Sequence, residues 1–405
     1  MGFNLMRVLL VHNKYRTSAP SGEDEAVENE RRMLEAHGVE VATFLRCNDD
    51  IDESSVAAKS KLVANTIWSR RSRRQLADAL KIVRPDLVHV HNTFAMLSPS
   101  VYGACRRAQV PVVQTLHNFR FFCPGSLFLR DGKPCEDCVD RSLWQSVRHR
   151  CYRNSLGATV TLATMLTVHR SLGTYSRGIT RYVALTKFAR DKIMKGGIPG
   201  DKVVIKPNFI SNPPAEGKGG GQYAIFVGRL LEEKGAETLI KAWRRFPHFK
   251  LRILGDGALR PKLESLARSE GLNIEFAGRQ PKNVVLQSIA DAEFMIIPSE
   301  CYEGFPMVIA ESYACGTPVL ASRIGSLNEL VEEGVTGRKF TAGDPDSLAD
   351  TAQRMLNDPQ ELRRMRARAR AYFDASLTEE KNYEQLVKIY SDVIEEYARG
   401  EMRLA

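Results

Sequence analysis

Two glutamates, Glu303 and Glu311, lie eight residues apart in the stretch ECYEGFPMVIAE, on either side of a Gly-Phe-Pro turn. A helix that begins at Pro306 carries Glu311 on its second turn and leaves Glu303 in the preceding loop, because proline suits the first helical position. The exposed N–H groups of residues 305–308 could then bind an anion. The plainer alternative is that Glu303 caps the helix and Glu311 is a surface residue.

Two cations follow an apolar run earlier in the same half of the chain. Arg229 and Lys234 lie in VGRLLEEKG, just beyond a predicted strand over residues 223–228. Arginine offers a planar fork of donors and lysine a point charge, and together they suit a diphosphate. The alternative is two solvated surface charges. The segment Gly255-Asp256-Gly257 ends the next predicted strand, and its glycines allow a ligand to approach the backbone closely.

The elements that must position these residues alternate along the whole chain. Short apolar runs separated by amphipathic helical stretches predict parallel sheets covered on both faces. The predicted strands are 7–12, 39–44, 86–90, 110–116 and 181–185, then 223–228, 249–255, 273–278, 293–298 and 317–322. We therefore expect an α/β protein with two doubly wound, Rossmann-like domains facing a cleft.

The domain boundaries follow from a break in this pattern. The stretch NFISNPPAEGKGGGQ is rich in proline and glycine and is typical of a linker. We expect an N-terminal Rossmann-like domain over residues 1–209, a linker over 210–222 and a C-terminal Rossmann-like domain over 223–377. A last helix over 378–405 is expected to pack back on the N-terminal domain.

The composition limits the classes of function. The chain has 405 residues, 43% hydrophobic and 26% charged, with a net charge of +10, so it can form buried cores and favours an anionic partner. Residues 6–11 read as a first strand rather than a signal peptide, and the weakly polar run Leu156–Val168 is too short to span a bilayer. We expect a soluble, cytoplasmic protein, with a peripheral position on the inner face of the cell membrane as a second option.

The motifs taken together resemble glycosyltransferase family 4. The resemblance lies in VGRLLEEKG, GDG, EGFPMVIAE, ACGTPV and EEGVTGRKF, and it extends over nearly the whole chain. It implies the GT-B fold and sugar transfer from a nucleotide donor with retention at the anomeric carbon and without a bound divalent metal. It implies that no cofactor is required for catalysis. The acceptor it implies is a glycan or lipid-linked molecule, in polysaccharide or lipopolysaccharide synthesis.

The resemblance also implies that the domain over 1–209 binds the acceptor and that the domain over 223–377 binds the nucleotide-sugar, with a role for each motif residue. Arg229 and Lys234 would hold the donor diphosphate. Glu303 would bind hydroxyls of the transferred sugar, aided by the backbone of Gly304 and Phe305, and Glu311 would bind the ribose. The base would lie near Gly255 and against the backbone of residues 278–280, where either UDP or GDP fits.

Three residues of the first half are assigned to the same reaction. Gly22, after Ser21 and before a long helix, is similar to the family's glycine loop and would let the backbone approach the leaving phosphate. His117 follows a predicted strand in QTLHNF, where the family has a histidine near the transferred sugar. Asn118 stands where an aspartate is common and receives no role, and His91 is a secondary acceptor-side candidate. The alternative for His117 is a structural histidine.

The catalytic set is therefore His117, Arg229, Lys234 and Glu303. Since no nucleophile is evident, the expected mechanism is front-face attack by the acceptor hydroxyl, in which the leaving phosphate helps to take the proton. The competing functions are another GT-B enzyme, such as a nucleotide-sugar epimerase, and a basic nucleic-acid-binding protein. No recognised nucleic-acid motif supports the second, so we expect no nucleic-acid partner.

Two further features lie outside these motifs. Cys123, Cys135, Cys138 and Cys151 include one C-x2-C pair and could form a structural zinc site, the alternative being four reduced thiols. Basic stretches at 68–74 and 141–153 each combine arginines with a tryptophan. They favour contact with an anionic membrane surface, and the alternative is a solvated helix face.

Overall fold

The computed structural model describes residues 6–18 and 21–400, and their contacts divide the chain into two units. The first unit contains the chain up to Ser126, residues Glu136–Pro207 and the segment from Asn382 onward. The second contains Leu127–Cys135 and Asn208–Lys381. The short segment 127–135 and the last helix therefore group with a different unit from the residues that precede them.

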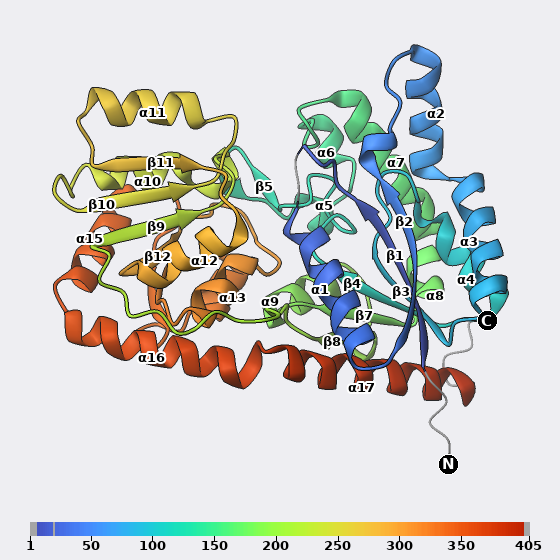
Figure 1. Cartoon of the computed structure of the whole chain (residues 1–405). Helices are drawn as coiled ribbons and strands as arrows, with labels where there is room; N and C mark the ends of the chain where they lie inside the picture. Colours follow the sequence, from blue (N-terminus) through green and yellow to red (C-terminus); the bar gives the residue numbers. More distant parts are fainter. Residues whose placement is uncertain (1–5, 19–20, 401–405) are drawn as a thin grey trace. The chain divides into compact units, whose positions relative to one another are not determined.

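The first unit is built on a six-stranded parallel sheet in the order β2-β1-β3-β4-β7-β8 (Figure 1). Its strands are β1 (Arg7–Lys14), β2 (Glu40–Cys47), β3 (Leu87–Asn92), β4 (Val112–Leu116), β7 (Arg181–Ala184) and β8 (Val203–Ile205). Its helices are α1 (Gly22–Ala36), α2 (Val56–Ile67), α3 (Arg70–Val83), α4 (Tyr102–Ala108), α5 (Asp137–Asp140), α6 (Gln145–Arg148), α7 (Leu156–Ser171), α8 (Thr174–Gly178), α9 (Lys187–Lys195) and most of α17 (Glu379–Ala398).

The second unit has a parallel sheet in the order β11-β10-β9-β12-β13-β14, the arrangement of a dinucleotide-binding fold. The strands are β9 (Tyr223–Val227), β10 (Lys250–Leu254), β11 (Ile274–Gly278), β12 (Phe294–Ile297), β13 (Val319–Ser322) and β14 (Gly337–Phe340). The helices are α10 (Ala236–Trp243), α11 (Arg260–Ser269), α12 (Lys282–Asp291), α13 (Met307–Ala314), α14 (Gly325–Leu330), α15 (Pro345–Leu356) and α16 (Pro359–Ser376). Strands β5 (Leu129–Arg130) and β6 (Lys133–Pro134) form a separate antiparallel hairpin.

The prediction of an α/β fold with two doubly wound sheets is confirmed. All ten predicted strands form, with ends shifted by at most three residues. Four short strands were missed: β8 and β14 at the sheet edges, and β5 and β6 of the separate hairpin. They have only two to four residues each, too few to show a hydrophobic period.

The core of the second unit shows why its strands read as continuous apolar runs. Strands β12 and β13 are buried along their whole length, because helices cover both faces of a parallel sheet. Trp243 of α10 is fully buried beside them, and its indole Nε1 donates to the carbonyl of Phe249 at 3.0 Å. This packing fixes the strand ends, where the candidate donor-binding residues lie.

The segment expected as a linker, residues 210–222, contains no helix or strand but is fixed by hydrogen bonds to the second unit. The amide of Gly217 donates to the carbonyl of Cys315 at 2.9 Å, and that of Gly221 donates to the carbonyl of Asp291 at 2.9 Å. A Cβ at Gly217 would lie 2.3 Å from the carbonyl oxygen of Ala290, so only glycine fits there.

Candidate functional site

The candidate donor residues of the second unit gather at the point where its strand order reverses. In this sheet β9 lies between β10 and β12, and the loops after β9 and β12 leave in opposite directions along the sheet. Ligands of open parallel sheets bind at such a switch point, beyond the carboxyl ends of the strands. Arg229 and Lys234 follow β9, whereas Glu303, Gly304 and Phe305 follow β12.

Lys234 and Glu303 form an ion pair in this site. The lysine Nζ donates to Glu303 Oε1 at 2.5 Å, and the hydroxyl of Ser299 donates to the same oxygen at 2.7 Å. Burial alone would raise the pKa of Glu303, but the charge and hydrogen bonds of Lys234 and Ser299, with Arg229 nearby, hold it below its usual range. Burial alone would lower the pKa of Lys234, but Glu303 raises it. Both groups are therefore charged near neutral pH.

Arg229 is exposed, unlike Lys234, whose side chain is 23% exposed. Its positive charge acts on both members of the ion pair, opposing the protonation of each. An exposed guanidinium and a half-buried ammonium are therefore both close to Glu303. Two neighbouring cations suit a diphosphate, and this role stays a prediction.

Two glycines bring the loops of this site close together. Gly235 has φ +68°, and a Cβ there would lie 1.8 Å from the carbonyl oxygen of Pro298. Gly255 has φ +139°, and a Cβ there would lie 1.9 Å from the carbonyl oxygen of Gly228. Both glycines therefore have a structural role, because they let neighbouring strand ends approach closely. The predicted contact of Gly255 with the donor would be an additional role.

Helix α13 begins one residue later than expected. Pro306 is its N-cap, with φ −65° and ψ 120°, and Met307 is the first helical residue, because the carbonyl of Pro306 accepts from the amide of Ile309 at 3.0 Å. Phe305 is buried and Gly304 is half-buried. The helix therefore begins within two residues of Phe305, and the anion site at residues 305–308 stays a prediction.

Glu311 is buried on α13, which excludes the alternative of a surface residue. Lys282, the first residue of α12, donates from Nζ to Glu311 Oε1 at 2.6 Å. Sequence reasoning placed a base against residues 278–280 but missed Lys282 two residues later. The sequence signal that could have identified Lys282 is its position: it begins a helix that directly follows a strand of the same sheet.

The first unit places Gly22 and His117 on separate elements. Gly22 is exposed and begins α1, with Ser21 as N-cap, so the expected glycine loop is instead the first turn of a helix. The side chain of Ser21 accepts from the amide of Glu23, because serine is a good N-cap. His117 lies immediately after β4 and is half-buried.

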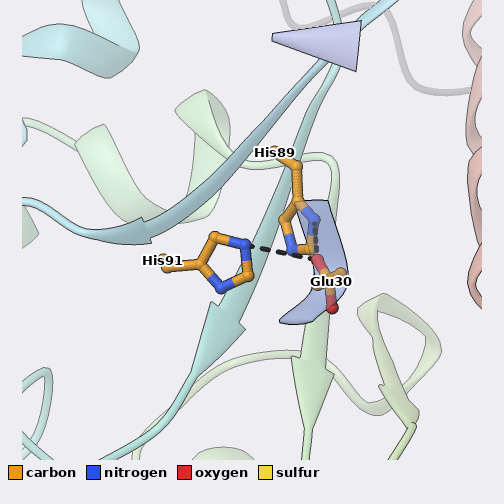
Figure 2. A group of neighbouring side chains, drawn as sticks. All are labelled: Glu30, His89 and His91. Carbon is orange, nitrogen blue, oxygen red and sulfur yellow. Dashed lines mark ion pairs between the residues drawn. The ribbon is translucent and has the colours of Figure 1, made fainter. Parts of the chain in front are cut away.

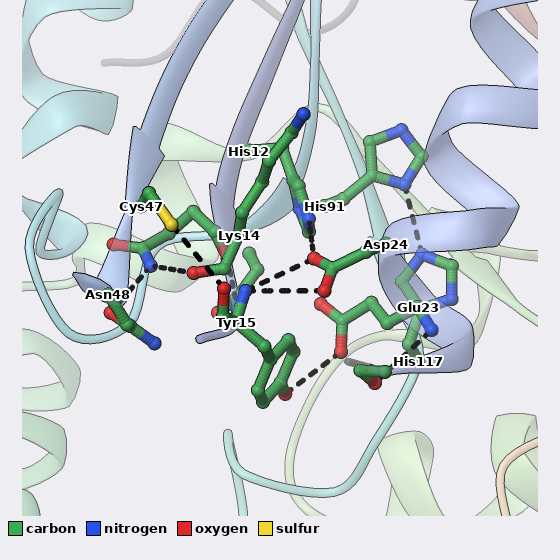
Figure 3. Close-up of polar contacts among 12 residues, drawn as sticks. His12, Lys14, Tyr15, Glu23, Asp24, Cys47, Asn48, His91 and His117 are labelled. Atoms are coloured by element: carbon green, nitrogen blue, oxygen red, sulfur yellow. Dashed lines mark hydrogen bonds and ion pairs between the residues drawn. The ribbon is translucent and has the colours of Figure 1, made fainter. Parts of the chain in front are cut away.

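Two acids of the first turn of α1 fix the loop after β1 (Figure 3). Asp24 Oδ1 lies 2.7 Å from His12 Nε2 and accepts from the amide of Tyr15 at 3.2 Å. Glu23 Oε2 accepts from the hydroxyl of Tyr15 at 3.1 Å and from Asn118 Nδ2 at 3.2 Å. Asn118, which received no role from sequence, thus connects the loop after β4 to α1.

His117 is connected to a buried cluster of polar side chains, of which Figure 2 shows Glu30, His89 and His91. Its Nε2 lies 3.0 Å from Nδ1 of His91, and Nε2 of His91 lies 3.3 Å from Oε1 of Glu30. The same oxygen lies 2.9 Å from Nδ1 of His89. Burial and the neighbouring His89 lower the pKa of His91 to about 3, and burial and His91 also lower that of His117. Both imidazoles are therefore neutral at pH 7.

Glu30 orients this chain of side chains. Its carboxylate favours a proton on the facing Nε2 of His91, so Nδ1 of His91 accepts from the Nε2–H of His117. The second nitrogen of His117, Nδ1, is then an acceptor for a ligand hydroxyl. Sequence reasoning found His117 and His91 but missed Glu30, because nothing local marks one acid of the helix as buried.

Glu30, His89 and His91 are also the group with metal-ligand spacing in residues 6–18 and 21–400. Lys206 Nζ lies 3.1 Å from Glu30 Oε2, and the hydroxyl of Tyr390 on α17 lies 2.7 Å from His89 Nδ1. The ammonium of Lys206 already balances the buried carboxylate, so a divalent ion would add charge next to a buried cation. The cluster therefore fits a polar network better than a metal centre.

The predicted zinc and membrane features have the following positions. Cys123 and Cys138 are buried, and Cys135 and Cys151 are half-buried. The zinc site stays a prediction.

Of the two tryptophans in the basic stretches, Trp144 is 48% exposed, as a membrane-facing ring requires, whereas Trp68 stacks on His169 with ring centroids 5.3 Å apart. Across the described chain, none of the helices combines the length and the apolarity needed to cross a bilayer.

Two family models match the chain. The model described as glycosyltransferase family 4 matches residues 25–211, and that described as glycosyl transferases group 1 matches residues 210–372. Together they extend from residue 25 to residue 372 and meet where the chain passes from the first unit to the second.

Curated relatives match one part of the chain each. D-inositol 3-phosphate glycosyltransferase of Corynebacterium urealyticum is 34% identical over 41% of this chain and 42% of its own length. A GDP-mannose-dependent monoacylated alpha-(1-6)-phosphatidylinositol monomannoside mannosyltransferase of Corynebacterium glutamicum is 31% identical over 40% and 45%. The chain spans about half the length of the curated relatives it matches.

A solved structure, Anabaena Alr3699/HepE in complex with UDP, covers 96% of this chain and 100% of its own at a TM-score of 0.66 and 18% identity. At this identity the likeness shows the fold, which is GT-B. The two family models, which together match residues 25–372, show that the chain belongs to glycosyltransferase family 4.

Proposed function

We propose that the protein is a retaining glycosyltransferase that moves a sugar from a UDP- or GDP-sugar to a glycan or lipid-linked acceptor in cell-surface polysaccharide or lipopolysaccharide synthesis. The observation that carries the proposal is the group at the switch point of the second unit. Arg229, the Lys234–Glu303 pair and the N-terminus of α13 lie where a parallel sheet binds a nucleotide.

In the proposed reaction the cations act on the leaving phosphate. Arg229 and Lys234 hold the diphosphate and stabilise the charge that develops as the glycosidic bond breaks. Glu303 fixes the ammonium of Lys234 by the 2.5 Å contact and accepts hydrogen bonds from the transferred sugar. Glu311 binds the ribose, and the backbone beside Gly255 meets the base.

The acceptor hydroxyl attacks on the face from which the phosphate departs, and a phosphate oxygen takes its proton. His117 positions the transferred sugar through Nδ1, the nitrogen that does not face His91. Chemistry of this kind requires positioning and stabilisation of charge rather than a protein nucleophile. The reaction is proposed to need no divalent metal.

Binding of nucleotides tests the donor site. UDP, GDP and ADP are compared, and we expect one of them to bind. At ~100 times its Kd, that nucleotide should stabilise the second unit by roughly 2.7 kcal/mol. For a unit of this size, the expected rise in Tm is roughly 5–10 °C. The rise should be lost in Arg229→Ala and kept in Arg268→Ala, since Arg268 is exposed on α11. A shift of equal size in both variants, or none with any nucleotide, would contradict the assignment.

Turnover tests the catalytic role. Lys234→Ala should lower kcat, because it should raise the activation free energy by about 2–4 kcal/mol, the range for removal of a preorganised hydrogen-bond donor. Lys241→Ala, an exposed lysine of α10, is the matched control and should keep its kcat. The anomeric configuration of the product, read by NMR, should equal that of the donor. An inverted product would refute the retaining mechanism, and an epimerised free sugar would favour an epimerase.

A further inference from the structure

The first unit contains a cavity of about 250 Å³ between α2 and α7, two helices that pack on each other. Its walls are mostly apolar and include Leu62, Val63, Phe94, Ala95, Ala158 and Leu162. The volume is many times the ~30 Å³ that one water molecule occupies in the liquid. None of the sequence motifs pointed to this place.

Two of the polar side chains in the wall are satisfied within the protein. Thr66 donates from its hydroxyl to the carbonyl of Ala95 at 3.3 Å, and Thr161 donates to the carbonyl of Gly157 at 2.8 Å. The wall also includes Asn48, Glu53 and three arginines, which could contact a polar head group. Its apolar side chains would favourably desolvate a hydrocarbon chain attached to such a head group.

The same two helices expose apolar side chains to solvent. Val56 and Val63 of α2 are 81% and 43% exposed, and Leu156 and Val160 of α7 are 51% and 36% exposed. Large apolar residues gathered on two packed helices indicate a surface that meets an apolar partner. The chain of a lipid entering the cavity from this side would cross such a surface.

One end of the cavity carries the cation Arg120. Arg120 holds its guanidinium 4.5 Å from the ring of Phe94, and within the described residues its buried Nε and Nη1 have no hydrogen-bond partner. Burial of a donor without an acceptor is unfavourable, and more so when the donor is charged. Arg16, paired with Glu53 at 3.4 Å, and the exposed Arg153 lie at the same cavity.

Arg120 also connects the cavity to the candidate catalytic residues of this unit. Phe94 and Arg120 line a second, smaller cavity together with His91 and His117. An anionic head group held by Arg120 would therefore lie beside His117, while an attached chain extended away between α2 and α7.

The nearby carboxylate of Glu23 does not take the place of that anion. Its hydrogen bonds come from Tyr15 and Asn118 rather than from Arg120. Burial raises the pKa of Glu23, and the nearby charges of His12 and Arg120 oppose that shift. Because Glu23 accepts no hydrogen bond from Arg120, the guanidinium is available to a second anion, and its planar fork of donors matches a phosphate.

We propose that the first unit binds a single-chain lipid phosphate, with the hydrocarbon chain between α2 and α7 and the phosphate on Arg120, and that this lipid carries or is the sugar acceptor. The binding site stands on the cavity and on the guanidinium of Arg120; its role as acceptor site rests on the proposed glycosyl transfer.

Three probes separate the parts of this ligand. Farnesyl phosphate, farnesol and inorganic phosphate are titrated into the whole chain by calorimetry, without detergent. Farnesyl phosphate should bind at least tenfold more tightly than farnesol, and inorganic phosphate should bind at least a hundredfold more weakly than farnesyl phosphate. If farnesol bound as tightly as farnesyl phosphate, the phosphate site would be refuted. If inorganic phosphate bound as tightly as farnesyl phosphate, the site for the hydrocarbon chain would be refuted.

Variants locate the binding. Arg120→Gln should weaken farnesyl phosphate about tenfold or more and leave farnesol unchanged, and Arg120→Lys should recover part of the loss. Ala158→Leu, which fills the cavity, should weaken both lipids. The matched controls are Arg71→Gln and Ile82→Trp, at exposed positions of α3, and both should bind as the wild type does. Thermal unfolding checks that each variant is folded.

The outcomes for the two proposals are distinguishable. If UDP or GDP still raises Tm through Arg229 but Arg120→Gln leaves farnesyl phosphate binding unchanged, the lipid site is refuted and the donor site stands. If farnesyl phosphate binding depends on Arg120 while no nucleotide binds, the lipid site stands and the glycosyl-transfer proposal falls.

Discussion

Replacement of Glu30 by glutamine should destabilise the first unit strongly. Glu30 and Lys206 are 4% and 2% exposed, and Lys206 Nζ lies 3.1 Å from Glu30 Oε2. Glu30→Gln keeps the size of the side chain but removes its charge. The ammonium of Lys206 would then retain Asn382 Oδ1, at 2.8 Å, but lose the adjacent carboxylate.

The magnitude follows from the distance. Two unit charges 3.1 Å apart attract by about 5 kcal/mol at an effective dielectric constant near 20. Removal of one member of a buried ion pair typically costs about 3–5 kcal/mol, because the other charge remains buried without compensation. A domain has about 5–15 kcal/mol of total stability, so this is a large part of it.

Urea unfolding followed by circular dichroism measures the loss. Glu28→Gln is the matched control on the same helix, since Glu28 pairs at the surface with Arg31 and Arg32 at 2.7 and 2.8 Å. We expect the control to cost less than ~1 kcal/mol. The double variant Glu30→Gln/Lys206→Met, which removes both charges, should be more stable than Glu30→Gln alone.

The pH dependence gives a second readout. Burial would raise the pKa of Glu30, but Lys206, His89 and His91 hold it well below its usual range. Its contribution is therefore complete above the unfolded value of ~4.3 and is lost as the pH falls through the lower folded value. The wild type should lose this stability in acid and Glu30→Gln should not. A Glu30→Gln variant within 1 kcal/mol of the wild type, or a double variant less stable than the single one, would refute the reasoning.

Three other predictions concern the second unit and the cysteines. Because the folded pKa of Glu303 is lowered, its pair with Lys234 should stabilise the unit above pH ~4.3 and lose that effect as the pH falls, and Glu303→Gln should flatten the acid limb of a plot of Tm against pH. Gly235→Ala should lower the free energy of unfolding in urea by more than ~1 kcal/mol, because a Cβ there would lie 1.8 Å from the Pro298 carbonyl oxygen. Gly271→Ala is the control: Gly271 also has a positive φ, +61°, but open space around it, so its loss should be clearly smaller. Equal losses would contradict the close contact at Gly235. Elemental analysis of purified protein should find one zinc per chain if the four cysteines bind it. A protein without zinc, whose Tm does not change when zinc is added, would refute that prediction.

The second unit could be predicted in detail because its candidate functional residues are local in sequence. Arg229, Lys234, Glu303 and Glu311 each lie within a few residues of a strand end or a helix start. In a parallel sheet all strand carboxyl ends lie at one edge, so an alternating pattern is enough to bring such residues together. The sequence alone therefore determined the two doubly wound sheets and the candidate donor residues.

Only the tertiary structure decided which polar residues are buried and what they contact. Glu30, His89, Lys206 and Tyr390 come from α1, β3, the loop after β8 and α17, and they meet in one cluster. Helical periodicity shows that a face is polar but not that one of its acids is buried against a distant lysine. The buried Nε and Nη1 of Arg120, which have no hydrogen-bond partner in the described part of the chain, and the cavity between α2 and α7 could not be predicted from sequence either. Burial and hydrogen bonding depend on packing between elements that are far apart in the chain.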